Sequence, residues 1–202
     1  MIPLVAWVIS HVAVAGAPAV PSAAPTAAPE MCHSTAPSPF TRSEHGYVVP
    51  DLALTDQGGH PVSMRAIAAS DQPVALNFIF ATCTTICPVM TATFSQVREE
   101  LGADAARVKF VSITIDPEHD TPAVLAAYAE RFEAPADWAF LTGASADVEQ
   151  VLRAFDAWSG SKLAHQPITL LHAPGRDGWI RLEGLGGGAA LAAEVRPLLA
   201  AR

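Results

Sequence analysis

Two cysteines stand four residues apart in FATCTTICPVM, residues 80–90. Cys83 and Cys87 follow an apolar run of strand length, VALNFIF, and precede a segment with helical periodicity. A helix N-terminus stabilises a nearby anion, so we expect at least one thiol to have a pKa below the free value of roughly 8.5. Thiolate is both the nucleophilic and the metal-ligating form of cysteine. The pair can therefore be a redox couple, a nucleophile with its resolving partner, or two metal ligands.

The spacing of the pair is compatible with either a metal or a disulfide. In a helical turn, residues four apart lie on one face with their Cα atoms about 6 Å apart, so both sulfurs can reach one ion or form a slightly strained disulfide. A permanent disulfide closing so short a loop would remove little entropy from the unfolded chain. Two thiolates are soft ligands that suit Cu(I), whereas a site that also accepts Cu(II) or zinc needs an imidazole.

One of the seven histidines is placed to supply that imidazole. His165, in KLAHQPITLL, comes just before an apolar stretch of strand length. If this strand runs antiparallel beside residues 74–80, its start lies at the same edge of the sheet as the end of that strand. His165 is therefore the candidate third ligand, beside Cys83 and Cys87.

Alternating strand and helix patterns surround these residues. Strands of a continuous sheet are expected at 74–80, 108–115 and 138–141, and hairpins at 47–64, around DQGG, and at 168–183, around PGRDG. Helices are expected from Cys87 to Leu101, from Thr121-Pro122 through AVLAAYAERF, from Ser145 onward, and over 189–200. This order predicts an α/β fold, with a central mixed sheet covered by helices on both faces and an N-terminal β-hairpin.

Composition limits the possible partners. With 202 residues, half of them apolar, the chain can bury the core of one domain. A net charge of -8 without any cluster of Lys and Arg argues against nucleic acid as a partner.

The N-terminal region differs in character from the rest. The apolar segment IPLVAWVISHVAVAGA, with Ala13-Val14-Ala15 as a cleavage site, predicts a signal peptide or membrane anchor over residues 1–15. Both place the remaining chain outside the cytoplasm. Residues 16–45 are rich in Pro and Ala and predict an extended linker, so the domain is expected over 46–202. Met31-Cys32-His33 within the linker is either an incidental thiol or a tail that collects copper or exchanges thiols.

Two motifs together are similar to a known family. Cys83-Thr-Thr-Ile-Cys87-Pro88 after a strand, VSITIDPEHDTP at 111–122, and a histidine before a later strand resemble the SCO/SenC family. The resemblance covers about residues 46–200 and implies a thioredoxin-like fold. It further implies copper, as Cu(I) or Cu(II), bound by Cys83, Cys87 and His165. Four residues match the family's acidic loop near the site: Asp116, Pro117, Asp120 and Thr121.

The resemblance implies a metallochaperone rather than an enzyme in the strict sense. It would deliver copper to the copper-bearing subunit of cytochrome c oxidase, at a CuA-type site. We expect a monomer in the periplasm, free or tethered to the membrane through its N-terminus. The alternative is a thiol-disulfide oxidoreductase that keeps the cysteines of a partner reduced through exchange at Cys83 and Cys87.

Overall fold

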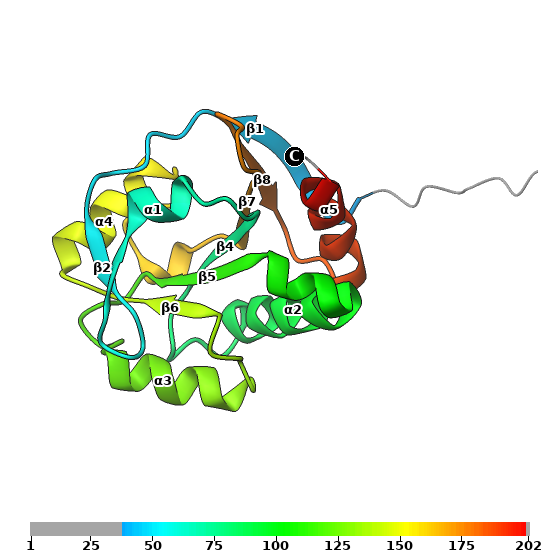
Figure 1. The fold of residues 1–202 in the computed structure, drawn as a ribbon. Coiled ribbons are helices and arrows are strands. Elements are labelled where there is room, and N and C mark those ends of the chain that lie inside the picture. The colour runs from blue at the N-terminus through cyan, green and yellow to red at the C-terminus, as the bar shows by residue number, and fades with distance from the viewer. Residues whose placement is uncertain (1–37, 201–202) are drawn as a thin grey trace, which may run out of the picture. The chain divides into compact units, whose positions relative to one another are not determined.

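The computed structural model describes residues 38–200, in which a six-stranded sheet forms the centre of the domain (Figure 1). Across the sheet the strands follow the order β1-β8-β7-β4-β5-β6. Their bounds are β1 Thr41–His45, β4 Val74–Ile79, β5 Lys109–Thr114, β6 Ala139–Leu141, β7 Ile168–His172 and β8 Trp179–Glu183. Strands β2 (Ala53–Thr55) and β3 (Pro61–Ser63) form a separate hairpin, within the region where one was expected.

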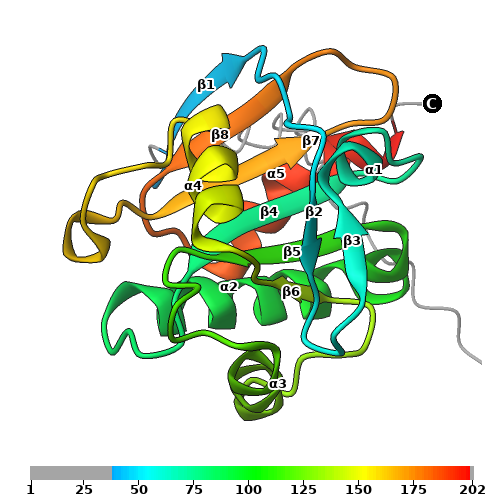
Figure 2. The same ribbon diagram turned by 90° about the vertical axis from the view of Figure 1, so that its left-hand side faces the viewer.

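Strand direction brings two distant segments to one edge of the sheet. Strands β4, β5 and β6 are parallel, whereas β7 runs antiparallel to β4, with Asn77 opposite Thr169 and Val74 opposite His172. The residues that follow β4 and those that precede β7 therefore emerge at the same edge, as expected from the sequence. Figure 2 shows these two connections on the same side of the sheet.

Helices cover both faces, which confirms the expected fold class. Along β4, Ala75 and Ile79 face one core, and Leu76 and Phe78 face the other. The first core is closed by helices α2 (Ile86–Leu101), α3 (Pro122–Arg131) and α5 (Gly188–Ala200). The second is closed by α1 (Met64–Ala68), α4 (Ser145–Ala154) and the β2–β3 hairpin (Figure 2).

Helix α2 has the buried face that its periodicity predicted. The apolar residues on this face include Met90, Phe94, Val97 and Leu101, and the helix ends at Gly102, whose φ of 57° is favourable for glycine. The helix begins at Ile86, one residue earlier than expected, so Cys87 lies in its first turn. The backbone amides of this turn consequently point toward the loop that carries Cys83.

The expected linker boundary at residue 45 is wrong, because Thr41–His45 form strand β1 and pair antiparallel with β8. Its sequence, TRSEH, lacks apolar alternation because an edge strand with largely exposed side chains needs none. Helix α1 and a 3-10 helix at Gly102–Arg107 were also not expected. The segments expected as signal peptide and as the first part of the linker, with Met31-Cys32-His33, lie outside the described residues.

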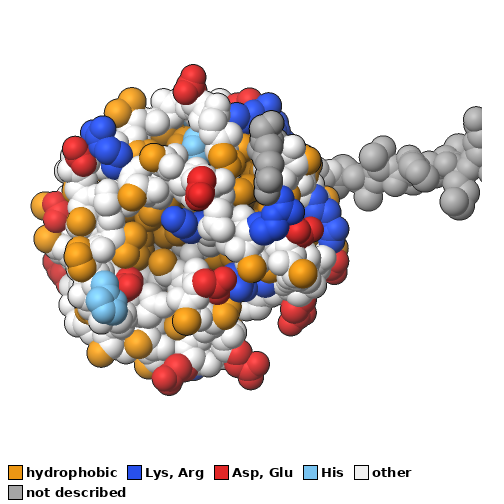
Figure 3. Space-filling model, viewed as in Figure 1, with side chains coloured by type: hydrophobic (Ala, Val, Ile, Leu, Met, Phe, Trp, Pro, Cys, Tyr) orange, Lys and Arg blue, Asp and Glu red, His pale blue; other side chains and the backbone are white. Residues whose placement is uncertain are grey.

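Acidic and basic side chains are interspersed over the face shown in Figure 3. Several charged side chains of the described residues form ion pairs, such as Arg98 with Asp137 at 2.9 Å. None of the helices between residues 38 and 200 combines the length and the apolar character needed to cross a membrane.

Candidate metal centre

The Cys83 sulfur acts as a capping group for helix α2 from two residues before the N-cap position. Cys83 follows β4 in a turn in which its backbone N–H donates to the Phe80 carbonyl, with 3.1 Å between N and O. Thr85 is the N-cap residue of α2, and its side chain makes no capping hydrogen bond within the described residues. Instead, the N–H of Cys87 donates to the Cys83 sulfur, with 3.5 Å between N and Sγ. The sulfur thus receives the hydrogen bond that a capping oxygen usually accepts.

The two thiols differ strongly in acidity. Burial would raise the pKa of Cys83, but hydrogen bonds from the backbone of Cys87 and Thr85 outweigh it and lower the pKa to about 7. Burial and the hydrogen bond shared with Cys83 raise the pKa of Cys87 to about 12. Cys87 is fully buried, and neither cysteine is in a disulfide. Near neutral pH, therefore, Cys83 is partly thiolate and Cys87 is a thiol.

This asymmetry predicts the course of alkylation. With iodoacetamide on the reduced protein, the rate at Cys83 is expected to rise between about pH 6 and 8, because its thiolate forms through a pKa of about 7. Cys87 is expected to react only after unfolding. Peptide mass spectrometry of samples quenched across this pH range measures both rates. Equal rates at the two cysteines in the folded protein would contradict the assignment.

His165 lies at the same edge of the sheet, in the connection between α4 and β7. Its side chain is buried, and Nε2 lies 3.0 Å from the Phe78 carbonyl of β4. Since a carbonyl can only accept, Nε2 carries the proton and Nδ1 holds the lone pair. Burial lowers the pKa of His165, and the hydrogen bond to Phe78 opposes this only in part. The imidazole is thus neutral near pH 7, the form that binds metals.

The lone pair on His165 Nδ1 is available to a ligand. Nδ1 is buried and finds no hydrogen-bond partner among the described residues. Histidines that bind metals usually donate their other ring N–H to a carbonyl or carboxylate, as Nε2 does to Phe78 here. The donor types and the orphaned nitrogen therefore fit a soft metal ion that also accepts imidazole.

The structure brings Cys83 and Cys87 together but leaves His165 apart from them. Between residues 38 and 200, no three His, Cys, Asp or Glu side chains are close enough to hold a metal ion. His165 as a third ligand remains a prediction, and ligation would require its loop to approach the sulfurs.

The acidic loop, residues 115–121, is hydrogen-bonded to the backbone that precedes Cys83. Asp120 accepts hydrogen bonds from the Ala81 N–H at 3.0 Å and from the Thr114 hydroxyl at 2.5 Å. Burial raises the pKa of Asp120, and its Oδ1 is without a partner in the described chain. As expected, Thr121 caps α3, with Pro122 in its first turn. Asp120 thereby fixes the backbone that leads into Cys83.

Asp116 contacts the loop that carries His165. Its Oδ2 lies 2.5 Å from Lys162 Nζ, three residues before His165, and its Oδ1 lies 2.9 Å from Nδ1 of His119. Burial would raise the pKa of Asp116, but the hydrogen bonds from Lys162 and His119 lower it. Neither Lys162 nor Thr114 could be predicted from the sequence, because a lysine in a polar loop and a threonine in a buried strand carry no local signal.

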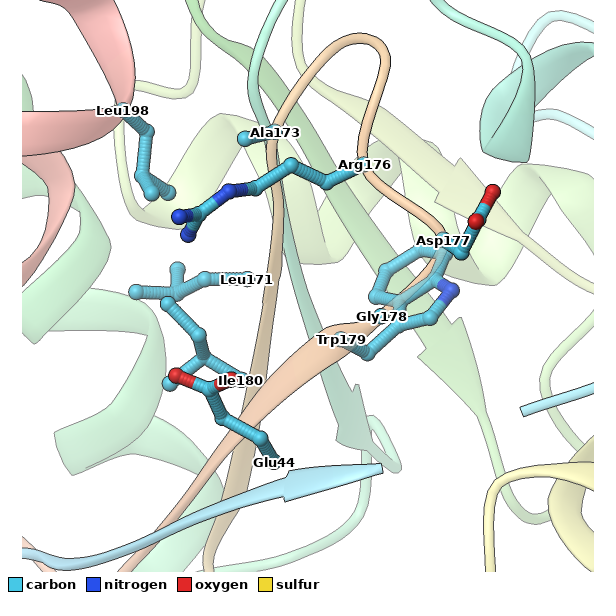
Figure 4. Close-up of a pocket in the computed structure, with 9 residues that line it drawn as sticks. All are labelled: Glu44, Leu171, Ala173, Arg176, Asp177, Gly178, Trp179, Ile180 and Leu198. Atoms are coloured by element: carbon cyan, nitrogen blue, oxygen red, sulfur yellow. The ribbon is translucent and has the colours of Figure 1, made fainter. Parts of the chain in front are cut away.

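A surface cavity of about 270 Å³ lies away from these residues, at the turn between β7 and β8. In Figure 4 the Arg176 side chain extends across this cavity toward Leu198, with Glu44 on the opposite side. Because β7 is antiparallel to β4, this turn lies at the end of the sheet opposite Cys83 and His165. The cavity is therefore not part of the candidate metal centre.

Comparison with known proteins identifies relatives of the domain. The SCO1/SenC family model matches residues 41–173. The SCO1 protein homolog of Bacillus subtilis is 34% identical over 114 residues, which are 55% of this chain and 58% of that protein. The chain thus matches somewhat more than half the length of this curated relative.

Solved structures share the fold. The copper-bound structure of Bradyrhizobium japonicum ScoI superposes with a TM-score of 0.62 at 25% identity, covering 75% of this chain and 99% of that chain. BsSco, a member of the Sco family of cytochrome c oxidase assembly proteins in which a disulfide switch was identified, has a TM-score of 0.64 at 26% identity. That match covers 77% of this chain and 95% of BsSco. These similarities confirm the expected thioredoxin-like fold.

Proposed function

Because this chain belongs to the SCO1/SenC family, we propose that it is a copper-binding metallochaperone that holds copper through Cys83, Cys87 and His165. Copper is its cargo rather than a resident cofactor. The observation that carries the proposal is the buried Nδ1 of His165, which has no hydrogen-bond partner among residues 38–200 and lies at the sheet edge that also holds the cysteine pair. The copper-bound structure of Bradyrhizobium japonicum ScoI supports the choice of metal.

The donor set suits both oxidation states of copper. Two thiolates favour Cu(I), and a neutral imidazole makes Cu(II) acceptable. Cys83 is already partly ionised near pH 7, so it is the natural first ligand, whereas Cys87 must release its proton on binding. Proton release makes loading more favourable as pH rises.

We propose delivery to the copper-bearing subunit of a respiratory oxidase, at a CuA-type site. Support comes from the description of BsSco as a member of a family of cytochrome c oxidase assembly proteins. Such a role places the chain outside the cytoplasm, in keeping with the export signal expected over residues 1–15. We propose that the protein acts as a monomer, since its binding edge must be open to the recipient.

Substitution of His165 tests the ligand set. The reduced full-length protein is titrated with Cu(I) and with Cu(II) under anaerobic conditions. Wild type is expected to bind about one equivalent of each, with a sulfur-to-Cu(II) charge-transfer absorption. His165→Ala is expected to retain Cu(I) on its two thiolates and to lose most of the Cu(II) absorption, because the harder ion loses its imidazole.

His60→Ala is the matched control, because the His60 side chain is 78% exposed and lies in the β2–β3 turn. It is expected to match wild type in both titrations. Failure of wild type to bind copper near one equivalent would overturn the proposed function. An unchanged Cu(II) absorption in His165→Ala would overturn the role of His165 alone.

The unequal acidity of the two thiols supports a second function, thiol-disulfide reduction. The Cys83 thiolate would attack a disulfide of a partner, forming a mixed disulfide and releasing one partner thiolate. Cys87, once deprotonated, would then attack the Cys83 sulfur. The partner would leave as a dithiol, with Cys83 and Cys87 oxidised to a disulfide, and an external dithiol would restore them.

Turnover without copper distinguishes this function from the first. The metal-free protein with excess dithiothreitol is compared with dithiothreitol alone in reducing a partner disulfide. A clear acceleration that His165→Ala leaves unchanged would favour the reductase. A rate equal to dithiothreitol alone would exclude it.

A further inference from the structure

The loop that carries His165 packs loosely on the domain over part of its length. This histidine loop, residues 157–167, contains the 3-10 helix Lys162–Ala164. A cavity of about 150 Å³ lies between the first half of the loop, Leu152 of α4 and Ile115 of the acidic loop. Leu163 is 89% exposed and contributes no packing. Close packing therefore does not hold this part of the loop in place.

The ion pair between Lys162 and Asp116 crosses from the histidine loop to the acidic loop. The Lys162 ammonium lies 2.5 Å from Asp116 Oδ2 and 5.7 Å from the centre of the Phe80 ring. Asp116 is itself held in place, because its N–H donates to the Thr114 hydroxyl at 2.9 Å and its Oδ1 pairs with His119. The Asp116 side chain is only 10% exposed, and these two hydrogen bonds fix its position. It can therefore fix the position of the Lys162 ammonium.

A single turn of 3-10 helix connects Lys162 to His165. The His165 N–H donates to the Lys162 carbonyl at 3.4 Å, closing the single 3-10 turn between them. Movement of Lys162 is therefore passed to the backbone of His165, whose side chain is held separately by the hydrogen bond to Phe78. On the other side of the acidic loop, Thr114 donates to Asp120, which binds the Ala81 N–H ahead of Cys83. One hydrogen-bonded framework thus reaches both the histidine loop and the cysteine loop.

We propose that the Lys162–Asp116 ion pair is a positioning element that limits the movement of the histidine loop at the sheet edge it shares with Cys83 and Cys87, and so favours copper binding by His165. This inference rests on the proposed function. Without the ion pair, the histidine loop keeps the hydrogen bond from His165 to Phe78 but loses its attachment to the acidic loop, so ligation by His165 must order a more mobile segment. Loss of the pair should weaken retention of Cu(II), which depends on imidazole, more than retention of Cu(I).

The test measures how fast Cu(II) leaves the full-length protein for an excess of chelator. Lys162→Met keeps the length of the side chain and removes its charge. It is expected to release Cu(II) about three- to tenfold faster than wild type, the loss that corresponds to one ordinary hydrogen bond, because solvent screens the 39% exposed Lys162 side chain. Lys162→Arg, which preserves the charge, is expected to stay within about twofold of wild type.

The chain offers a matched control in its only other lysine. Lys109 lies at the start of β5, at the opposite end of the strand from Thr114. Lys109→Met is expected to release Cu(II) at the wild-type rate. Asp116→Asn should reproduce the effect of Lys162→Met, and the double variant should be no faster than the faster single variant, since both changes break one interaction. Thermal unfolding of each variant checks that the fold is unchanged.

Three outcomes separate the possibilities. Faster release in Lys162→Met, rescue by Lys162→Arg and non-additivity with Asp116→Asn support the positioning role. Wild-type release from Lys162→Met, or effects that multiply in the double variant, overturn it while leaving the copper function intact. If wild type binds no copper, the proposed function itself fails.

Discussion

Replacing Cys87 with serine is expected to reduce the copper affinity of this protein by at least about 100-fold. Even groups that only orient a ligand contribute about 10- to 100-fold to metal affinity. A serine hydroxyl is hard and does not ionise near pH 7, so it cannot replace a thiolate toward Cu(I). Cys83→Ser should have an equal or greater effect, because Cys83 is the thiol already ionised near neutral pH. Competition with a Cu(I) chelator measures both affinities.

The third cysteine provides the control for this pair. Cys32→Ser removes a thiol from the same chain that is not one of the proposed copper ligands. It is expected to keep the affinity of wild type. Retention of copper by Cys83→Ser or Cys87→Ser, combined with its loss in Cys32→Ser, would move the copper site to the N-terminal segment.

The largest expected loss of stability comes from Trp138, in the core between the sheet and helix α2. The side chain is fully buried, with its ring centroid 5.0 Å from that of Phe140 and 5.6 Å from that of Phe94. Its Nε1–H donates to the Ser112 hydroxyl at 3.1 Å, which in turn donates to Asn77. Trp138→Ala is expected to lower the free energy of unfolding by about 3–5 kcal/mol, because it creates a large cavity and leaves Ser112 with one partner fewer.

Urea denaturation followed by circular dichroism measures this change. Trp158→Ala is the matched control, because Trp158 is 39% exposed and the centre of its ring lies 5.1 Å from the Arg153 guanidinium. Its expected cost is less than about 1 kcal/mol. Similar losses in the two variants would contradict the central position of Trp138 in the core.

The chemistry of the cysteine pair was accessible from local sequence. The spacing of Cys83 and Cys87 at the start of a helix predicted a lowered thiol pKa, and the structure confirms this for Cys83. Which thiol would be acidic was not predictable. That depends on burial, which leaves Cys87 in the core and places the Cys83 sulfur against the first turn of α2.

The supporting residues depended on tertiary contacts. Lys162 and Asp116 are 46 residues apart in the chain, and Ala81 and Asp120 are 39 apart. No local periodicity links such pairs, since each contact arises only when the ends of β4 and β5 meet the start of β7 at one edge. Strand β1 was missed for a related reason: its five residues are polar, and only pairing with β8 makes them a strand.

The sequence alone determined the α/β class, the order of most elements, the identity of the two cysteines and the similarity to a copper-protein family. These properties follow from apolar periodicity, helix and turn signals and closely spaced motifs, all of which are local. Only the tertiary structure decided that Cys83 and not Cys87 is the acidic thiol. It also decided that His165 offers Nδ1 while bound to Phe78, and that Lys162 ties its loop to Asp116. Burial and hydrogen bonds between distant segments set acidity, tautomer and loop position, and these exist only once the chain has folded.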